Sequence, residues 1–152
     1  MTAATRSQTM SDDVVDFLAH QQFVTISTSS FTGMPHADTV AFVNDRSRIY
    51  FHILDDTQIR NIRDNRHVSL AVDEYSAEWR KVRELRGAGP CTMAAPGEHH
   101  LAAELFVEKY GRPFQQARGP LYRLMPSQLE FVEFGDALHG TPRARTFHLD
   151  DA

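Results

Sequence analysis

Residues 48–74 constrain the fold more than any other part of the chain. Two apolar runs, residues 48–54 and 68–72, alternate with the period of two that is typical of half-buried β-strands. The polar segment between them, residues 58–66, has the spacing of a short helix. Its basic stripe consists of Arg60, Arg63 and Arg66. Such a stripe is usually a solvated face, but free N–H groups at a helix start beside guanidinium groups also suit a phosphate. The stretch predicts a strand, a short basic helix and a return strand, which form a plausible cradle for an anionic cofactor.

The chain before this stretch predicts one helix and two successive hairpins. Ser11 is a good helix N-cap, and apolar residues three and four apart follow it as far as about His20. β-Branched residues favour strands over residues 23–29 and 37–44, with turn sequences on either side of the second strand. Because hairpins join these strands to residues 48–54, we expect an antiparallel sheet.

The second half of the chain adds further strands and the clearest helix. Pro96 opens a helical stripe that runs to Tyr110, and Gly111 follows where a helix end is expected. Residues 135–152 either add an edge strand or reach a partner subunit. The remaining predicted elements are strands at 79–85, continuing through 91–94, strands at 121–125 and 129–134, and a loop at 112–120.

Together these elements predict a mainly β protein with a few α-helices. An antiparallel barrel is the natural closure, because it removes exposed strand edges. The length of 152 residues suits one domain. We expect residues 1–10 to be a disordered leader and residues 11–152 to form that single domain.

Charge, cysteine content and the pattern of apolar residues indicate where the protein works and which partners it is not expected to have. The net charge of −4 is small, which leans against nucleic acid and anionic membranes as partners. Cys91 is the only cysteine, so an internal disulfide is excluded, which fits a reducing compartment. Residues 1–13 lack the apolar core of a signal peptide, and no apolar run approaches the ~20 residues of a membrane span. We therefore expect a cytoplasmic protein.

Common catalytic motifs are missing from the sequence. It contains no G-x-S-x-G, P-loop, H-E-x-x-H or paired C-x-x-C sequence. Their absence leans against hydrolases, Walker-type nucleotidases and nicotinamide enzymes of the usual fold. His99 and His100 are adjacent, so on a helix they point about 100° apart and do not easily chelate one ion. No metal site is expected.

Two single residues leave two interpretations open. His52 lies in the strand predicted at residues 48–54, where its side chain either faces water or lines a cofactor cavity. Trp79, the only tryptophan, is either a core or interface aromatic or a wall that packs against a flat ring.

Five segments, in chain order, resemble the pyridoxamine 5'-phosphate oxidase-like, FMN-binding split-barrel family. They read F-V-T-I-S-T, P-H-A-D-T-V-A-F-V, R-I-Y-F-H-I, T-Q-I-R-N-I-R-D-N-R-H-V-S-L-A-V and Y-S-A-E-W-R-K-V-R-E-L-R-G-A-G. The later L-Y-R-L-M-P-S-Q-L-E-F-V is similar to that family's closing strands. The resemblance covers about residues 12–134 and is most specific over residues 59–72.

The resemblance implies a six-stranded antiparallel split barrel and an obligate homodimer, with FMN in two symmetric clefts between the subunits. It implies a flavin-dependent oxidoreductase acting on a small molecule, in which the cofactor performs the redox step and the protein orients it. It assigns no catalytic residue. The cofactor-binding positions that it implies are Asp38, Thr39 and Val40 beside the ring, Phe51, His52 and Ile53 along the ring and ribityl chain, Thr57, Gln58 and Asn61 near the phosphate, and Trp79 near the cleft.

The chain departs from the family at two positions. The family commonly has a lysine at the position of Gln58, and its vitamin-B6 oxidase branch has an arginine at that of Asp38. Pyridoxamine phosphate oxidation itself is therefore not expected. The alternatives are a deazaflavin-dependent reductase, a barrel that has lost its cofactor, and a haem- or ligand-binding protein without flavin turnover. The candidate haem ligands are His52, His139 and His148.

Overall fold

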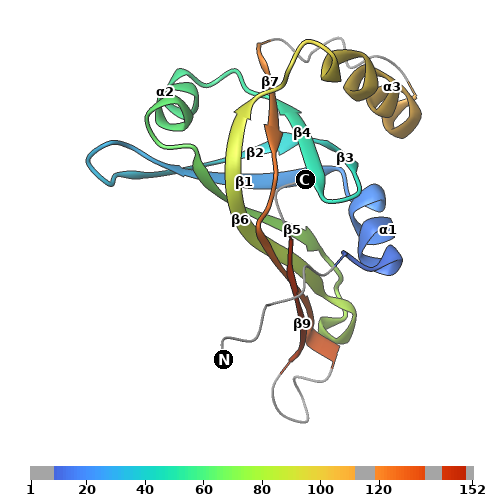
Figure 1. Ribbon diagram of the computed structural model, residues 1–152. Helices are drawn as coiled ribbons and strands as arrows, with labels where there is room; N and C mark the ends of the chain where they lie inside the picture. The colour runs from blue at the N-terminus through green and yellow to red at the C-terminus, as the bar shows by residue number, and fades with distance from the viewer. Residues whose placement is uncertain (1–8, 112–118, 136–141, 150–152) are drawn as a thin grey trace, which may run out of the picture.

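Nine strands, three α-helices and one 3₁₀ helix make up the described part of the chain, residues 9–111, 119–135 and 142–149 of a computed structural model (Figure 1). In chain order they are α1 (Asp12–His20), β1 (Phe23–Ser29), β2 (Pro35–Ala41), β3 (Val43–Asp45), β4 (Arg48–His52), α2 (Asp56–Asp64), β5 (His67–Glu74), η1 (Trp79–Lys81), β6 (Arg83–Met93), α3 (Glu98–Tyr110), β7 (Leu121–Leu124), β8 (Gln128–Glu133) and β9 (Arg143–His148).

The strands form one antiparallel sheet that curls around β6. Its order is β2-β1-β5-β6-β7-β4-β3, with β8 pairing with β6 and β9 pairing with β8. Residues 83–88 of β6 pair with β8, and residues 91–93 pair with β7, so this strand changes neighbours part of the way along. Figure 1 shows β6 curving through the centre, with α2 on one side of the barrel and α1 and α3 on the other. The expected mainly β, antiparallel split barrel is confirmed.

The sheet has more strands than the six that were expected, partly because the strand predicted over residues 37–44 is two strands. It breaks at Phe42, which is fully buried. The hydroxyl of Tyr110 accepts a hydrogen bond from the Phe42 amide (3.3 Å) and lies 2.8 Å from the Phe42 carbonyl oxygen. A side chain from α3 thus satisfies the backbone where it leaves the ladder, since a buried peptide group needs a partner.

Two glycines let the chain cross closely over β6. A Cβ atom on Gly87 would lie 2.3 Å from the Gln128 carbonyl oxygen, and one on Gly89 would lie 2.2 Å from that of Met125. Glycine within a strand often marks a bulge, but β6 continues through residues 87–90 to Met93. The glycines instead make room for the corner between β7 and β8.

The N-terminal helix covers one end of the core. Val14, Phe17 and Leu18 are buried, as their spacing predicts. Arg145 of β9 holds the helix start through an ion pair of 2.6 Å with Asp13. Met10 is also buried in the main core, although it falls within the predicted leader. Residues 1–8 of that leader lie outside the described residues.

Two predicted elements change their bounds or type, and one open alternative is decided. The short basic helix starts earlier, at Asp56, because Asp55 caps it. Trp79 was placed in a strand, but it begins the 3₁₀ helix η1, and β6 starts only at Arg83. Of the tail alternatives, the edge strand is present as β9, which pairs with β8. Most of the loop predicted at 112–120 lies outside the described residues.

Candidate functional site

A buried polar cluster lies between α2 and β1. Thr28, Gln58 and Asn61 are the three buried polar residues of the described chain. The Thr28 hydroxyl donates to Gln58 Oε1 (2.5 Å) and accepts from Asn61 Nδ2 (3.1 Å). Gln58 Nε2 donates to the carbonyl oxygen of Ile26 (3.1 Å). Gln58, expected near a cofactor phosphate, therefore points into the protein, and only 1% of it is exposed.

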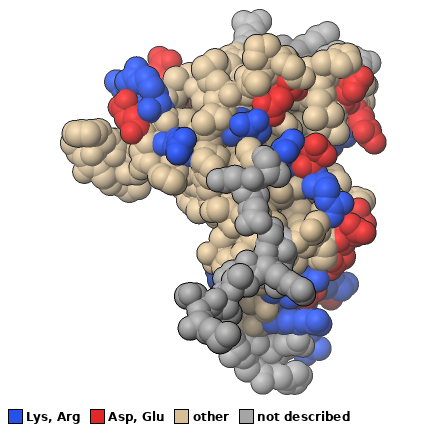
Figure 2. Space-filling view, in the orientation of Figure 1, with Lys and Arg blue, Asp and Glu red and all other residues tan. Residues whose placement is uncertain are grey.

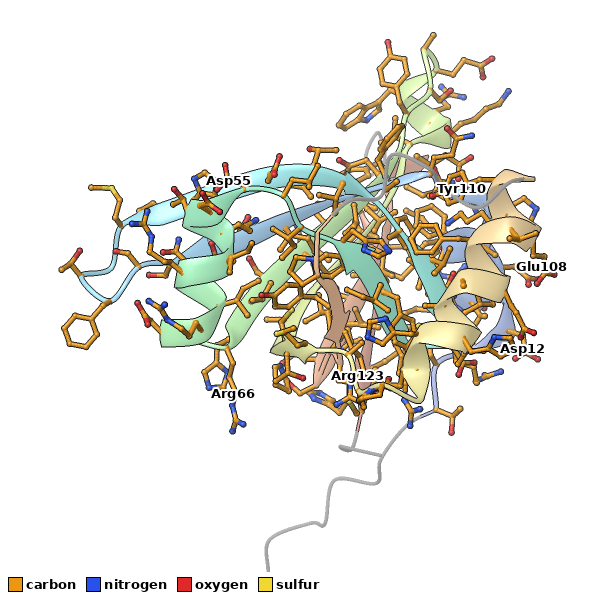
Figure 3. The ribbon with its side chains drawn as sticks, turned by 90° about the horizontal axis from the view of Figure 1, so that it is seen from above. Asp12, Asp55, Arg66, Glu108, Tyr110 and Arg123 are labelled. Carbon is orange, nitrogen blue, oxygen red and sulfur yellow. The ribbon has the colours of Figure 1, made fainter. Side chains whose placement is uncertain are left out.

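The start of α2 is capped by a carboxylate of the chain itself. Asp55 Oδ1 accepts a hydrogen bond of 2.9 Å from the Gln58 amide. This bond to the Gln58 backbone holds the pKa of Asp55 below its usual value, with further lowering by His36, the Thr57 amide and Arg60. His36 Nε2 lies 3.6 Å from the same carboxylate oxygen. Figure 3 shows Asp55 at the start of the helix, beside β2.

The two faces of β2 divide the residues expected beside the flavin ring. Asp38 and Val40 pair with the buried Ile26 and Val24 of β1, so they share the face on which α2 packs. Thr39 pairs with Thr25 on the other face, where their hydroxyl oxygens lie 3.3 Å apart.

That other face, called the outer face below, continues across six strands. Two rows of residues lie in register from β2 to β9. On β2, β1 and β5 these rows consist of small, uncharged side chains, and farther along, the ion pair between Arg86 and Glu130 (2.5 Å) interrupts them. A hollow of about 310 Å³ opens beside this pair. The rows are Ala37, Ser27, Ser69, Ala88, Gln128 and His148, and Thr39, Thr25, Ala71, Arg86, Glu130 and Thr146.

The third predicted group, on β4, lies mostly in the core. Phe51 and Ile53 are fully buried, and the Phe51 ring stacks on Tyr122. His52 is partly exposed, with Nδ1 3.0 Å from the carbonyl oxygen of Gly119 and its ring 5.7 Å from that of Phe106. The His52 side chain is thus held against α3 and the Gly119 backbone.

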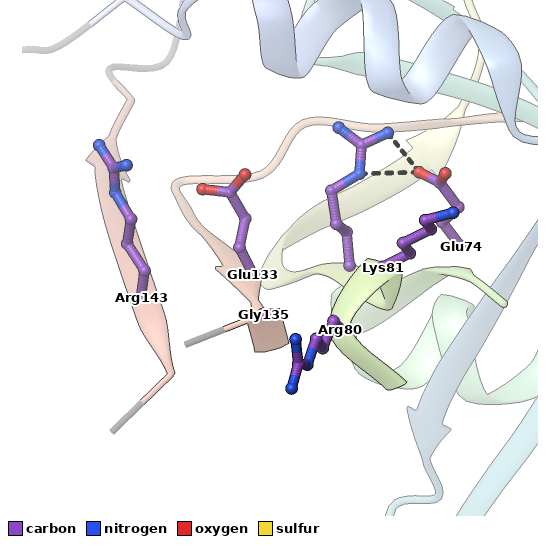
Figure 4. A pocket seen from close by; sticks show the side chains of 7 residues that line it. Glu74, Arg80, Lys81, Glu133, Gly135 and Arg143 are labelled. Atoms are coloured by element: carbon purple, nitrogen blue, oxygen red, sulfur yellow. Dashed lines mark hydrogen bonds and ion pairs between the residues drawn. The ribbon is translucent and has the colours of Figure 1, made fainter. Parts of the chain in front are cut away.

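Trp79 lies at the opposite end of the β5–β6 ladder from α2. Its ring packs 5.2 Å from that of Phe134 and is 54% exposed. Within one chain it therefore does not join the other predicted residues. Beside it is a charged pocket of about 450 Å³, seen in Figure 4. The pocket is lined by Glu74, Arg80, Lys81, Arg83, Glu133, Gly135 and Arg143.

One ion pair joins two residues that line this pocket, Arg83 and Glu74. Arg83 donates to the carboxylate of Glu74, the bonds drawn in Figure 4. Lys81 binds Glu78 at 3.2 Å, close to the pocket. Figure 2 shows basic side chains at this end of the molecule and a second group, mixed with acidic ones, at the place of α2.

The predicted basic stripe, of which Arg66 lies beyond the end of α2, faces solvent. Arg60, Arg63 and Arg66 are all exposed, and Figure 3 shows Arg66 pointing away from the body of the protein. Arg63 contacts Asp64, with 3.1 Å between Nε and the carboxylate. The stripe therefore follows the more common pattern of a solvated helix face.

Three residues at this site were missed by the sequence interpretation. Thr28 is polar on the inward side of β1, where its alternating neighbours are apolar, and that break in the pattern is a usable signal. Asp55 immediately precedes the helix, which is a preferred N-cap position for aspartate. His36 has no comparable sequence signal, because only the pairing of β2 with β1 brings it to α2.

Within the described ranges, no group of three or more histidine, cysteine or acidic side chains is arranged to hold a metal ion. The described helices include none that is long and apolar enough to cross a membrane.

Solved structures share this fold at low sequence identity. ChuZ of Campylobacter jejuni superposes with a TM-score of 0.67 at 17% identity, covering 90% of this chain and 61% of that one. HutZ, the haem storage protein of Vibrio cholerae, gives 0.63 at 18% identity, covering 80% and 94%. The FAD-binding protein of Mycobacterium smegmatis gives 0.62 at 16% identity, covering 94% and 100%. At these identities the likeness establishes the fold.

Comparison with curated proteins gives no match. A family model does match, however, and it spans residues 10–132, from α1 into β8. This range contains the cluster beneath α2, the outer face of β1, β2 and β5, and all ten predicted cofactor positions. By this match the chain belongs to the pyridoxamine 5'-phosphate oxidase family.

Proposed function

We propose that the protein is a flavin-dependent oxidoreductase that works as a homodimer on a small molecule. Membership of the family, over residues 10–132, supports a flavin as the first cofactor to test. One of the solved structures with this fold is that of an FAD-binding protein. A flavin would supply the redox chemistry, and the chain would supply orientation and exclusion of water.

The observation that carries the proposal is the outer face of β1, β2 and β5. Thr25, Ser27, Thr39, Ser69 and Ala71 form a continuous area of uncharged side chains. Hydroxyl groups there can hydrogen-bond to the polar edge of a flavin ring. A second copy of the chain, laid on this face, would bury the ring from the other side.

The FMN phosphate does not fit the place expected for it. Gln58 is buried and bonded to Thr28 and Ile26, so its side chain does not reach a ligand at the surface. Asp55 already occupies the Gln58 amide at the start of α2. A phosphate at this point would meet a carboxylate instead of a cation. We therefore propose that the flavin ring lies on the outer face and that no phosphate group of the cofactor contacts the start of α2.

The visible spectrum of the purified protein tests the cofactor. Absorbance at the flavin bands, with a flavin identified by mass after denaturation, supports the proposal. A colourless protein that takes up neither riboflavin, FMN nor FAD contradicts it. Comparing flavin with deazaflavin affinity by titration separates the deazaflavin alternative.

The oligomeric state tests the dimer. Light scattering is expected to give twice the mass of the chain. Ser69→Arg places a cation on the outer face and is expected to yield monomers, while Ala103→Arg, at an exposed position of α3, should leave the dimer intact. A monomeric native protein contradicts the proposed assembly.

Haem is the second candidate, favoured by His148. This exposed histidine on β9 lies opposite Gln128, at the end of a row that crosses the outer face. HutZ, described as a haem storage protein, shares the fold. A Soret band that appears on haem addition and is lost in His148→Ala would support haem binding there. A band that survives alanine at His52, His139 and His148 rejects these ligands.

A further inference from the structure

We infer that Asp55 and Gln58 exclude a phosphate from the start of α2, so that the ligand of this site carries an uncharged group there. This inference rests on the proposal that a flavin-type ring lies on the outer face of β1 and β2. The helix α2 packs on the opposite face of these strands, but its start lies at β2, the end strand of the sheet order, where Asp55 is 3.6 Å from His36. The far end of a ligand on the outer face would therefore meet Asp55 around the edge of β2. It goes further by assigning a chemical class to the ligand: a flavin that ends in an alcohol, as riboflavin does, and not in a phosphate.

One of the amides that could bind an anion at the start of α2 is already occupied. A helix start binds anions through N–H groups that have no partner within the helix. At α2 the Gln58 amide donates to Asp55 Oδ1 at 2.9 Å. An incoming phosphate would have to displace this carboxylate, which is attached to the chain and therefore always present.

The charges around the helix start also oppose a phosphate. Asp55 and Asp56 stand side by side there, and Asp38 lies on the face of β2 that α2 covers. The nearby cation of α2, Arg60, and the imidazole of His36 both act on the Asp55 carboxylate. Since a phosphate carries nearly two negative charges, it would compete for these groups and repel the acidic ones.

The side chain of Gln58 points away from the surface. A long polar side chain at this position could reach a ligand only if it faced outward. Its amide oxygen accepts from Thr28 and its amide nitrogen donates to the Ile26 carbonyl. Because Asn61 also donates to Thr28, turning Gln58 outward would break a connected buried set of hydrogen bonds. The residue stabilises the helix position instead of contacting a ligand.

The test compares riboflavin with FMN, which differ only by the phosphate. Fluorescence titration of the cofactor-free protein is expected to show riboflavin binding about tenfold more tightly than FMN. Two variants dissect the preference. Asp55→Asn keeps the cap and removes the charge, and Asp55→Gly removes both, while glycine is still an acceptable N-cap. The preference for riboflavin should fall in Asp55→Asn and fall further in Asp55→Gly.

Asp56→Asn is the matched control. It removes the same charge from the neighbouring, exposed position, and its side chain makes no hydrogen bond to the helix start among the described contacts. This variant should change the preference less than Asp55→Asn does. Equal or tighter binding of FMN by the native protein overturns the inference, and so does an unchanged preference in both Asp55 variants.

A second measurement does not depend on flavin. Amide ¹H–¹⁵N spectra are recorded with increasing inorganic phosphate, against sodium chloride at equal ionic strength. The Thr57 and Gln58 signals of the native protein should show no saturable shift, whereas those of Asp55→Gly should. A saturable shift in the native protein overturns the inference, as does no gain in Asp55→Gly. If neither riboflavin nor FMN binds, the proposed function fails, and the phosphate titration still decides this inference.

Discussion

The hydroxyl of Thr28, on β1, donates a hydrogen bond of 2.5 Å to the side-chain oxygen of Gln58, on α2. The two residues are 30 positions apart in the chain. Together with Asn61 they fasten the helix to the barrel at the point where a cofactor phosphate would be expected. This relationship decides which way Gln58 points, and with it the chemistry of the site.

Thr28→Val should destabilise the protein while keeping the shape of the side chain. Without the hydroxyl, Gln58 Oε1 loses a donor and Asn61 Nδ2 loses an acceptor. Leaving such buried groups unpaired costs about 1–3 kcal/mol. Urea denaturation measures the change in the free energy of unfolding. Thr25→Val, on the outer face, is the control and should change it by less than about 0.5 kcal/mol. Equal changes in the free energy of unfolding for Thr28→Val and Thr25→Val would mean that the buried hydrogen bonds of Thr28 do not stabilise the protein.

Gly89→Ala should be strongly destabilising because β6 is crossed closely there. The added Cβ would lie 2.2 Å from the Met125 carbonyl oxygen, a backbone atom that can move only with the corner between β7 and β8. A cost of about 1–3 kcal/mol is expected. At Gly97 nothing lies within 4 Å of the added atom, so Gly97→Ala should be neutral or stabilising. Thermal unfolding of both variants makes the comparison, and a stable Gly89→Ala protein would argue against this crossing.

Asp13 should make stability depend on pH in the acid range. Its hydrogen bond with Arg145 lowers the Asp13 pKa from 3.8 to about 2. A lowered folded-state pKa stabilises the protein above the unfolded value, and this contribution is lost as the pH falls from about 4 to 2. The stability gap between native protein and Asp13→Asn should thus be widest above pH 4 and should close toward pH 2. A gap that is constant across this range would exclude the ion pair as its cause.

Cys91 should be unreactive in the folded protein. It is fully buried, and burial raises the pKa of its thiol to about 12. The thiolate is the reactive form, and so little of it is present at pH 8. A thiol-specific reagent such as Ellman's reagent should therefore label the chain only after denaturation. Rapid labelling of the native protein would show that β6 opens locally around this residue.

Much of the fold could be predicted from sequence because its signals are local. Alternation in residues 48–54 and 68–72 predicted β4 and β5, and the stripe that ends before Gly111 predicted α3. Gly111 indeed takes the left-handed conformation, with a φ of 73°, that glycine allows at a helix end. The order of the segments was enough to indicate the family that the match over residues 10–132 then established.

Hydrogen bonds between residues far apart in the sequence could not be predicted from local sequence patterns and became visible only in the tertiary structure. Tyr110 hydrogen-bonds to the Phe42 backbone, where the strand breaks, from a position 68 residues away, and Thr28 holds Gln58 inward from a position 30 residues away. Both effects arise because a buried polar group takes whichever partner the fold brings within reach. The sequence by itself thus determined the strands, the helices and the family. Only the packed barrel determined that Gln58 turns inward to Thr28 and that His36 lies beside Asp55 at the start of α2.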